Sequence, residues 1–485
     1  MSDAPGSRDV PLTFADHILY HARGRPERPA IILPDRIATY DMMAQGMLRV
    51  EDRIRALGLA PGEVVCVSLK NTIRHMIVTA ALFRLGFPTL SAWTPEDIIP
   101  LKLPVRTYLQ DAGELLHPGL RQILVGEEWF AGERRALSTA PGFASDDALC
   151  RIEITSGATG VPKAVCLTVR EFYLRVLQYY VAMSMGLGER LLGLVRLNSA
   201  WGFRVAARTL FAGGTLVGAD SPREALQMAS VYRVDSIVAS TQQVRDLLRE
   251  QARTAIPCPS LRAVLLGGAL ATRAMVLEAR AKLCEQVFVQ YGATELGPIA
   301  IAAAERLMEI EGASGYALPG VRIEIVDAQD RPLPADSDGV VRVHVRPMAR
   351  PYPLDSGRID PQQRDGWFYT GDRGRLTKEG LLILEGRTSE VINSGGVKRA
   401  PELIEEIALR HPDVAEAAAF GALGPDGIEE VNLAVVARAP ISQQQLIAWC
   451  AGRGLEVSRV FYVDALPKTP MGKIRRDELK TRLAG

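Results

Sequence analysis

The sequence predicts an α/β protein. A large N-terminal domain of doubly wound α/β sheets plus a small β-barrel is followed by a small α+β C-terminal domain. Two observations predict this fold class. Up to Val289, apolar strand-like runs alternate with helical patterns, which favours parallel sheets covered by helices. From about Val321, short alternating strands follow one another between Pro- and Gly-rich turns, which favours a small barrel or meander.

The alternation is clearest in two stretches. The first has helical patterns at 12–23, 40–57 and 72–85, with strands at 63–69 and near Thr89. The second has strands at 215–217, 236–239, 263–266 and 287–289, with helices at 222–232, 242–254 and 271–283 between them. Ligands of such sheets bind at the carboxyl ends of the strands. We therefore expect a nucleotide next to two segments that directly follow strands, Gly267-Gly268-Ala269 and Gln290-Tyr291-Gly292.

The C-terminal part has a different pattern of predicted strands and helices. Strands at 322–326 and 340–345 belong to the predicted barrel, which covers about 315–384. After Gly386, a helix at 401–409 and strands near 417–420 and 431–436 form a compact α+β unit. We place the N-terminal domain at 1–386, a hinge at 387–389 and the C-terminal domain at 390–485.

The composition excludes several function classes. Lys and Arg number 57 and Asp and Glu 56, so the formal net charge is +1, and no long basic block occurs. This balance argues against nucleic acid or an anionic membrane as a partner. The first residues lack a signal-sequence pattern, no apolar run reaches membrane-spanning length, and the six cysteines are scattered singly. We therefore expect a cytoplasmic protein.

The segment from Thr155 to Lys163 is the most informative part of the chain. Its two glycines let the backbone approach a ligand, and its hydroxyls and successive N–H groups can donate hydrogen bonds to a polyphosphate. It is not a Walker loop, because its two glycines are three residues apart and a Pro precedes the Lys. A surface turn that happens to contain a Lys is the alternative. The expected phosphate-binding residues are Thr155, Ser156, Gly157, Thr159, Gly160 and Lys163.

This segment, TSGATGVPKAV, resembles the phosphate-binding signature of adenylate-forming enzymes, which include acyl-CoA synthetases, adenylation domains of peptide synthetases and firefly-type luciferases. Four further segments resemble the family's motifs in the expected order: QYGATE at 290–295, WFYTGD at 367–372, EGR at 385–387 with the segments at 392–396 and 401–405, and PKTPMGKIRR at 467–476. Five ordered motifs do not arise by chance. The chain is identified as a member of the adenylate-forming (AMP-binding) superfamily, similar to stand-alone acyl-CoA synthetases.

The resemblance implies roles for individual residues in attack of a carboxylate on the α-phosphorus of ATP. Glu295 would supply a carboxylate for Mg²⁺, and Thr294 would contact the α-phosphate. Tyr291 would stack on adenine, Asp372 would accept hydrogen bonds from the ribose, and Arg387 would approach the ribose or a phosphate. Further ATP contacts are expected at Gly267, Gly268, Ala269, Gln290 and Gly292. Two departures from the family pattern, Ala158 and Ala164, predict slower phosphate handling.

The C-terminal motifs imply a second half-reaction. In the family, the lysine matching Lys473 bridges the carboxylate and the α-phosphate, and we expect it to be catalytic together with Thr294 and Glu295. The mobile C-terminal domain then rotates about the hinge, where Ser389 replaces the usual Asp or Lys. By this resemblance, the rotation would bring a small-residue segment, Ser394-Gly395-Gly396, to the tunnel for the pantetheine thiol.

The acyl pocket is the least specified part of the site. Asn198, Trp201 and Phe203 stand where family members carry a Phe-His stretch, and they suggest an apolar or aromatic acid, although the two aromatic residues fit a structural core equally well. No Asp or Glu occurs between Arg196 and Thr209, which argues against a free amino-acid substrate. Arg196, Arg204 and Arg208 can pair with a second substrate carboxylate, but a surface helix face is the favoured interpretation.

We therefore expect an ATP-dependent acid–thiol ligase that uses ATP, Mg²⁺ and coenzyme A on a small-molecule carboxylic acid, as a monomer or homodimer. One alternative is transfer of the acyl group to a separate carrier protein. Another is a non-catalytic relative that binds a nucleotide or acyl group, although intact Lys163, Glu295, Asp372 and Lys473 argue against it. Luciferase-like oxygenation is a more distant alternative.

Overall fold

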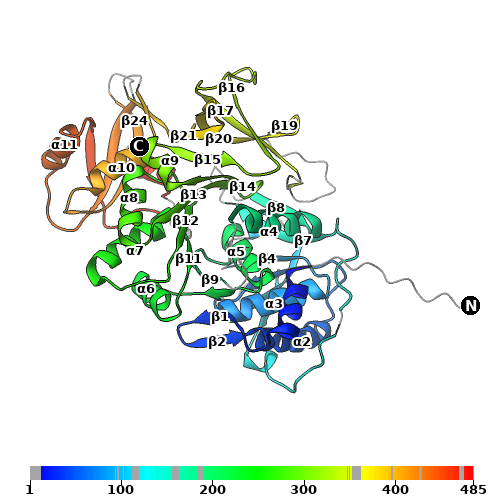
Figure 1. The fold of residues 1–485 in the computed structure, drawn as a ribbon. Helices are drawn as coiled ribbons and strands as arrows, with labels where there is room; N and C mark the ends of the chain where they lie inside the picture. Colours follow the sequence, from blue (N-terminus) through cyan, green and yellow to red (C-terminus); the bar gives the residue numbers. More distant parts are fainter. Residues whose placement is uncertain are drawn as a thin grey trace, which may run out of the picture.

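Most of the buried core packs against two sheets, and each sheet contains a central run of parallel strands. The computed structural model describes residues 13–92, 94, 98–101, 103–111, 119–138, 140–155, 163–183, 189–346, 348, 350–351, 362–394, 397–424, 429–468 and 474–483. Within these residues the fold class predicted from the sequence is confirmed: a mixed α/β N-terminal part precedes a smaller α+β part (Figure 1).

The first sheet has the strand order β18-β8-β7-β4-β3-β5-β6. Its bounds are β3 Val64–Ser68, β4 Thr89–Ser91, β5 Val105–Gln110, β6 Arg121–Leu124, β7 Leu149–Thr155, β8 Lys163–Thr168 and β18 Arg350–Pro351. Strands β7 and β8 pair antiparallel, with Thr155 opposite Lys163. The last residue of β7 and the first residue of β8 are therefore neighbours in this sheet.

The second sheet has the order β16-β17-β20-β21-β15-β14-β13-β12-β11-β9-β10-β1-β2, with β19 paired to β20. The strands at its parallel centre are β9 Arg190–Gly193, β10 Thr215–Val217, β11 Ser236–Ser240, β12 Ala263–Gly267 and β13 Gln286–Ala293. The strands at the β2 end are β1 Pro29–Leu33 and β2 Arg36–Thr39. The stretch predicted as a barrel or meander forms antiparallel strands that continue this sheet: β14 Gly297–Ala303, β15 Ala313–Ala317, β16 Val321–Val326, β17 Gly339–Val345, β19 Gln363–Arg364, β20 Trp367–Leu376 and β21 Leu381–Arg387.

Helices fill the space between the two sheets and cover the outer faces. The helices of this part are α1 Phe14–Gly24, α2 Tyr40–Ala56, α3 Thr72–Arg84, α4 Val169–Met183, α5 Ala200–Phe211, α6 Pro222–Val231, α7 Thr241–Thr254, α8 Arg273–Lys282 and α9 Ala304–Glu309, with 3₁₀ turns at Ile99–Leu101 and Glu127–Trp129. Helix α5 contacts β7 of the first sheet as well as β9 and β10 of the second. It starts at Ser199, whose side chain accepts a hydrogen bond from the Gly202 N–H.

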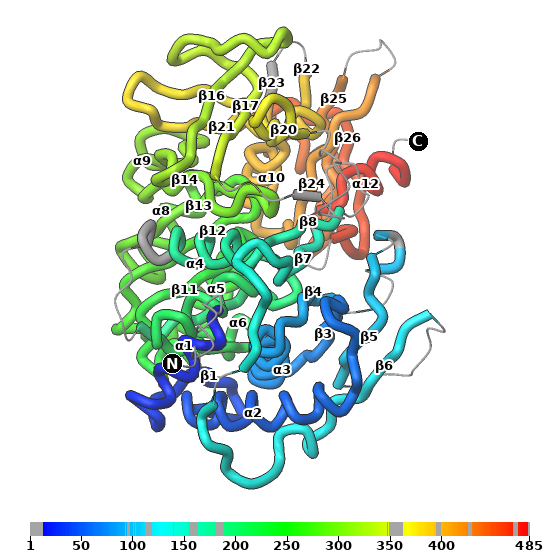
Figure 2. The backbone as a smooth tube through the Cα atoms, turned by 90° about the vertical axis from the view of Figure 1, so that its right-hand side faces the viewer, coloured from blue at the N-terminus to red at the C-terminus, as the bar shows by residue number. Residues whose placement is uncertain are grey.

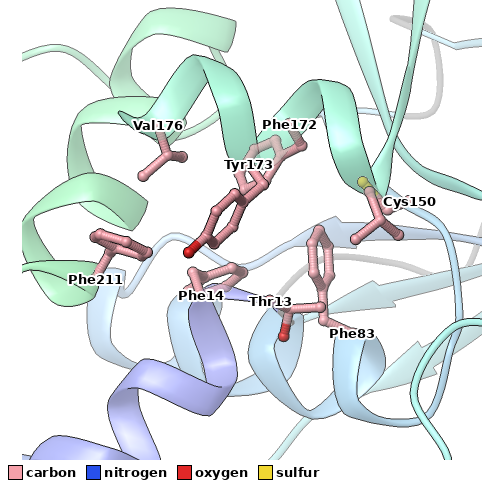
Figure 3. A pocket seen from close by; sticks show the side chains of 9 residues that line it. Thr13, Phe14, Phe83, Cys150, Phe172, Tyr173, Val176 and Phe211 are labelled. Atoms are coloured by element: carbon pink, nitrogen blue, oxygen red, sulfur yellow. The ribbon is translucent and has the colours of Figure 1, made fainter. Parts of the chain in front are cut away.

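Aromatic side chains form the core where α1, α3, α4 and α5 meet. The rings of Phe14, Phe83, Phe172 and Phe203 lie 5.2–6.3 Å apart, centre to centre, for each pair in contact. Figure 3 shows Phe14, Phe83 and Phe172 around a small cavity. Its volume of about 10 Å³ is no more than one water molecule needs, so this cavity is a packing gap in the core and not a ligand site.

The C-terminal part packs beside the second sheet. It contains β22 Ile392–Ser394 and β23 Val397–Arg399, and a sheet of β24 Val414–Leu423, β25 Glu429–Ala437 and β26 Arg459–Tyr462. Its helices are α10 Pro401–Leu409, α11 Gln443–Ala451 and α12 Arg476–Leu483. Figure 2 shows β25, β26 and α12, in orange and red, on the side of β20. A guanidinium group on α7, that of Arg249, donates to the Ala415 carbonyl at 2.8 Å and joins the two parts. Among the described helices, none has the length and apolar character needed to cross a membrane.

Candidate active site

A carboxylate with two partners lies at the centre of the site. Strands β20 and β21 place Asp372 opposite Arg387 in register. The phenol of Tyr291, near the end of β13, donates to Asp372 Oδ2 at 2.5 Å, and Arg387 Nε lies 3.3 Å from Asp372 Oδ1. Burial and the adjacent negative charge of Asp372 raise the pKa of Tyr291 well above its ordinary value, so the phenol remains a donor. Three sequence motifs therefore meet at one carboxylate.

Lys163, which ends the predicted phosphate-binding segment, is linked through Gln362 to the residues just before Asp372. Lys163 Nζ donates to Gln362 Oε1 at 3.2 Å, and Gln362 Nε2 donates to the Tyr369 carbonyl at 2.9 Å. Gly371 has φ +78°, and a Cβ built there would lie 4.0 Å from Gln362 Nε2 and 4.0 Å from Arg387 Nη1. The sequence does not predict Gln362, because it lies outside every motif.

Gly267 and Gly268, at the carboxyl end of β12, form another part of the candidate site. Gly267 pairs with Gln290 of the neighbouring strand, and a Cβ at Gly267 would lie only 2.7 Å from the Gln290 carbonyl oxygen, so only glycine fits. The ring of Trp201, at the start of α5, covers this turn: Cη2 lies 3.4 Å from a Cβ built at Gly267, and Cζ3 lies 3.9 Å from one at Gly268. Gly268 and Ala269 are exposed at the strand's carboxyl end, where the sequence predicts a ligand.

The turn after β13 carries Thr294 and Glu295, and both are half-buried. Arg175 of α4 binds the backbone of this turn. Its Nη1 donates to the Thr294 carbonyl at 2.8 Å, and its Nη2 donates to the Glu295 carbonyl at 2.5 Å. Arg175 is another residue that the motifs do not predict. Its position depends on α4 packing against β14, which the sequence pattern does not show.

Comparison with known proteins agrees with this geometry. Residues 110–352 match the AMP-binding enzyme family, and residues 403–473 match the AMP-binding enzyme C-terminal domain. This chain belongs to the AMP-binding enzyme family. The family and the fold that the five motifs predicted are thereby confirmed.

Two relatives and one solved structure show the kind of protein that this AMP-binding enzyme is similar to. It is 27% identical over 515 residues to the fatty acid–[acyl-carrier-protein] ligase ScoC of Streptomyces coeruleorubidus, covering 98% of this chain and 97% of the relative. It is 26% identical over 481 residues to the 2-succinylbenzoate–CoA ligase of Bacillus subtilis, covering 96% and 98%. The structure of o-succinylbenzoate coenzyme A synthetase (MenE) from Bacillus subtilis with ATP and magnesium ion matches with a TM-score of 0.84 at 25% identity, covering 96% of this chain and 99% of that one.

The structure divides the three residues expected in the acyl pocket. Phe203 is fully buried among the core phenyl rings, and the Arg151 guanidinium stacks on it at 3.7 Å, so Phe203 is a core residue and does not face a ligand. Asn198 and Trp201 lie at the start of α5, partly exposed, and each has a buried polar atom without a hydrogen bond, Oδ1 and Nε1 respectively. Of the three residues predicted for an acyl pocket, Asn198 and Trp201 therefore stay predictions, and the burial of Phe203 argues against that role for it.

The interpretation of Arg204 and Arg208 as a surface helix face is wrong. Each is only 3% exposed. Arg204 Nε lies 3.6 Å from Glu153 Oε1, and Arg208 Nη2 lies 3.5 Å from Glu189 Oε2. Helix α5 is covered by both sheets, so its arginines are buried and paired with carboxylates of other elements.

A cleft of about 1020 Å³ opens where carboxyl ends of strands from the two sheets face each other. It is lined by residues at the ends of β3, β9 and β10 or just after them, including Ser68, Gly193, Asn198 and Gly218. His75 also lines it, and burial together with the charge of Arg151 lowers the pKa of His75 to about 3, so this imidazole is neutral. The cleft has the position that doubly wound sheets give to ligand sites.

Several predicted site residues lie outside the described residues: Ser156, Gly157, Thr159, Gly160, Gly395, Gly396 and Lys473. Thr155 ends β7 and Ser394 ends β22, and their backbones alone are described. Ser389 lies in the turn between β21 and β22, where the Glu390 and Val391 N–H groups donate to the Arg387 carbonyl at 3.0 and 2.8 Å. A short turn therefore follows Arg387, at the predicted hinge.

Proposed function

We propose that this chain is an ATP-dependent acid–thiol ligase. In the first step, a carboxylate oxygen of the substrate attacks the α-phosphorus of ATP, the bond to the β-phosphate oxygen breaks, and pyrophosphate leaves. In the second step, the thiol of coenzyme A loses its proton, attacks the acyl carbon and displaces AMP. The observation that carries the proposal is the meeting of Tyr291, Asp372 and Arg387, with Lys163 joined to the same turn through Gln362.

The nucleotide would lie between this cluster and the glycines of β12. A carboxylate has about four acceptor positions, so Asp372 can hold Tyr291 and Arg387 and still accept from ribose hydroxyls. Gly267, Gly268 and Ala269 would let the adenosine approach the backbone, and Tyr291 would contact the adenine. Lys163, with the preceding segment from Thr155, would bind the β- and γ-phosphates.

Glu295, with the phosphates, would hold Mg²⁺, a hard cation that prefers oxygen ligands and is usually bound by one or two carboxylates plus substrate phosphates. Among the described residues, no three His, Cys, Asp or Glu side chains are placed to hold a metal ion, so no metal cage built by protein side chains alone competes with this arrangement. When bound, the ion would neutralise charge on the departing pyrophosphate. Lys473 and Thr294 would stabilise charge on the α-phosphate.

The acid would enter the cleft of about 1020 Å³, which Asn198 lines, and Trp201 lies between Asn198 and the glycines of β12. The ring of Trp201 offers an apolar face, which favours an apolar or aromatic acid. The absence of Asp and Glu between Arg196 and Thr209 argues against a free amino group on it.

A carrier protein is the second candidate acceptor, and the similarity to ScoC over 98% of this chain favours it. Holo-carrier protein and coenzyme A, offered separately to the enzyme with ATP and acid, distinguish the two acceptors by which thioester forms. The domain boundaries at 386 and 390, rotation about Ser389, the tunnel at Ser394-Gly395-Gly396, a cytoplasmic location, the lack of nucleic-acid and membrane partners, and a monomeric or homodimeric state stay predictions.

A pyrophosphate-release screen tests the function. The enzyme is incubated with MgATP and, separately, with acetate, fatty, aryl and dicarboxylic acids. We expect release that depends on one class of acid, with the acyl-adenylate trapped as the hydroxamate after addition of hydroxylamine. Absence of acid-dependent release across all classes contradicts the proposal.

A further inference from the structure

Arg175 is buried behind the turn that carries the predicted phosphate and Mg²⁺ contacts. The residue is 2% exposed, and its two terminal nitrogens donate to two consecutive carbonyls, those of Thr294 and Glu295, at 2.8 and 2.5 Å. A planar guanidinium that binds two adjacent carbonyls fixes the orientation of the peptide between them. The turn is therefore restrained at the two residues whose side chains the proposed reaction uses.

The same turn approaches a second guanidinium. Gly297 has φ +82°, and a Cβ built there would lie 3.5 Å from Arg204 Nη1 and 3.7 Å from Arg175 Cγ. These distances are ordinary van der Waals contacts, so it is the positive φ and not a lack of space that favours glycine here. Arg175 of α4 and Arg204 of α5 thus both contact the backbone of the turn at residues 294–297.

A carboxylate on β7 lies between these arginines. Glu153 Oε2 lies 3.7 Å from Arg175 Nη1, and Glu153 Oε1 lies 3.6 Å from Arg204 Nε. Glu153 is buried and lies two residues before Thr155, where the phosphate-binding segment begins. The arginine–carboxylate contacts thus connect the strand that leads into that segment with the turn at Thr294 and Glu295.

We propose that Arg175 is a positioning residue, which holds the Thr294–Glu295 turn in the conformation that binds the α-phosphate and Mg²⁺. The inference rests on the proposed function and deepens it. Arg175 touches neither nucleotide nor metal; it acts through the two carbonyls. Burial and the nearby charge of Arg204 lower the pKa of Arg175 to about 10, so it remains charged near neutral pH.

Arg175→Gln and Arg175→Lys in the full-length protein test the proposal, with Arg208→Gln as a matched control. Arg208 is also buried, lies on α5, which contacts α4, and is paired at 3.5 Å with Glu189, a carboxylate outside the turn. Hydrogen exchange of the amides at 290–297 is the first measurement. We expect exchange there to rise about tenfold in Arg175→Gln, equivalent to losing one charge-assisted hydrogen bond, and to stay at the wild-type rate in Arg208→Gln.

The Mg²⁺ dependence of pyrophosphate release is the second measurement. We expect the half-saturating Mg²⁺ concentration to rise about tenfold in Arg175→Gln and to stay unchanged in Arg208→Gln. It should rise less in Arg175→Lys, which keeps the positive charge but donates from a single nitrogen. Unchanged exchange at 290–297, or equal changes in the two Gln variants, overturns the positioning role. If the wild type releases no pyrophosphate with any acid, the proposed function fails, while hydrogen exchange still decides the role of Arg175.

Discussion

Two buried networks of charge, one in each part of the molecule, have opposite compositions. In the C-terminal part, Arg476 alone is surrounded by three carboxylates: Nη1 contacts Glu390 at 2.7 Å, and Nη2 contacts Glu405 at 2.7 Å and Glu402 at 3.2 Å. Its Nε donates to the Ala419 carbonyl at 3.2 Å. In the N-terminal part, the carboxylate of Glu153 lies between two arginines at 3.6 and 3.7 Å, and neither of its oxygens makes a hydrogen bond to a described residue.

The difference separates a structural network from a functional one. The Arg476 network is compact and joins α12 to α10 and to Glu390, the residue after the predicted hinge, so it holds the C-terminal part together. The N-terminal network lies behind the turn where we place ATP, and the oxygens of Glu153 make no hydrogen bond to a described residue. Buried charges are costly unless they are paired. We interpret this looser network as one whose electrostatic energy changes when a polyphosphate binds nearby.

The largest effect is expected when the C-terminal network loses its cation. Arg476→Met leaves three carboxylates facing one another and should lower the free energy of unfolding by about 4 kcal/mol at pH 8. Arg482→Met, at an exposed ion pair of the same helix, is the control and should cost under about 1 kcal/mol. Chemical denaturation measures both.

The pH dependence of this variant has a definite sign. Burial raises the pKa of Glu405 in the wild type, and removing Arg476 raises it further, because Arg476 opposes that shift. A carboxyl group with a raised folded-state pKa adds stability at low pH and loses it as the pH rises through that pKa. The difference in the free energy of unfolding between wild type and Arg476→Met should therefore become smaller as the pH falls from 8 to 5. An equal deficit at pH 5 and pH 8 contradicts this assignment.

A smaller effect is expected when the N-terminal network loses its carboxylate. Glu153→Gln should lower the free energy of unfolding of the nucleotide-free protein by about 3 kcal/mol, because the neighbouring arginines lose their counter-charge. MgATP should then stabilise the variant more than the wild type, since the bound phosphates face a larger positive charge. Thermal unfolding with and without MgATP measures this, and Glu189→Gln is the matched control. Equal stabilisation of wild type and variant by MgATP would show that the charge of Glu153 does not affect nucleotide binding.

The smallest effect is expected at the bridge between Lys163 and Tyr369. Gln362→Ala removes one hydrogen bond to the lysine and should raise the KM for MgATP about fivefold, equivalent to about 1 kcal/mol, with the unfolding midpoint unchanged. Gln329→Ala, at an exposed turn, serves as the control. A KM equal to that of the control removes Gln362 from the site.

The sequence predicted the fold class and the strands that lead to the site, because both follow from local patterns, but β13 continues to Ala293, four residues beyond its predicted end. The strand–helix alternation places Gly267 and Tyr291 at carboxyl ends, and the five motifs indicate a nucleotide. It did not predict Arg175, Glu153 or Gln362, since their partners lie far away along the chain: Gln362 is 199 residues from Lys163, and Arg175 is 120 from Glu295. The prediction for Arg204 and Arg208 failed for the same reason. Arginines spaced along a helix look exposed until the sheets on both sides of α5 are placed.

Binding of a non-hydrolysable acyl-sulfamoyl adenosine, made with the acid that the screen selects, tests the adenylate site most directly. Isothermal titration should show tight binding to the wild type. Affinity should fall about a hundredfold in Asp372→Asn, which loses the charged acceptor for the ribose, while the unfolding midpoint stays close to that of the wild type. Equal affinity in wild type and Asp372→Asn, or no binding to the wild type, would contradict the placement of the adenylate at Asp372.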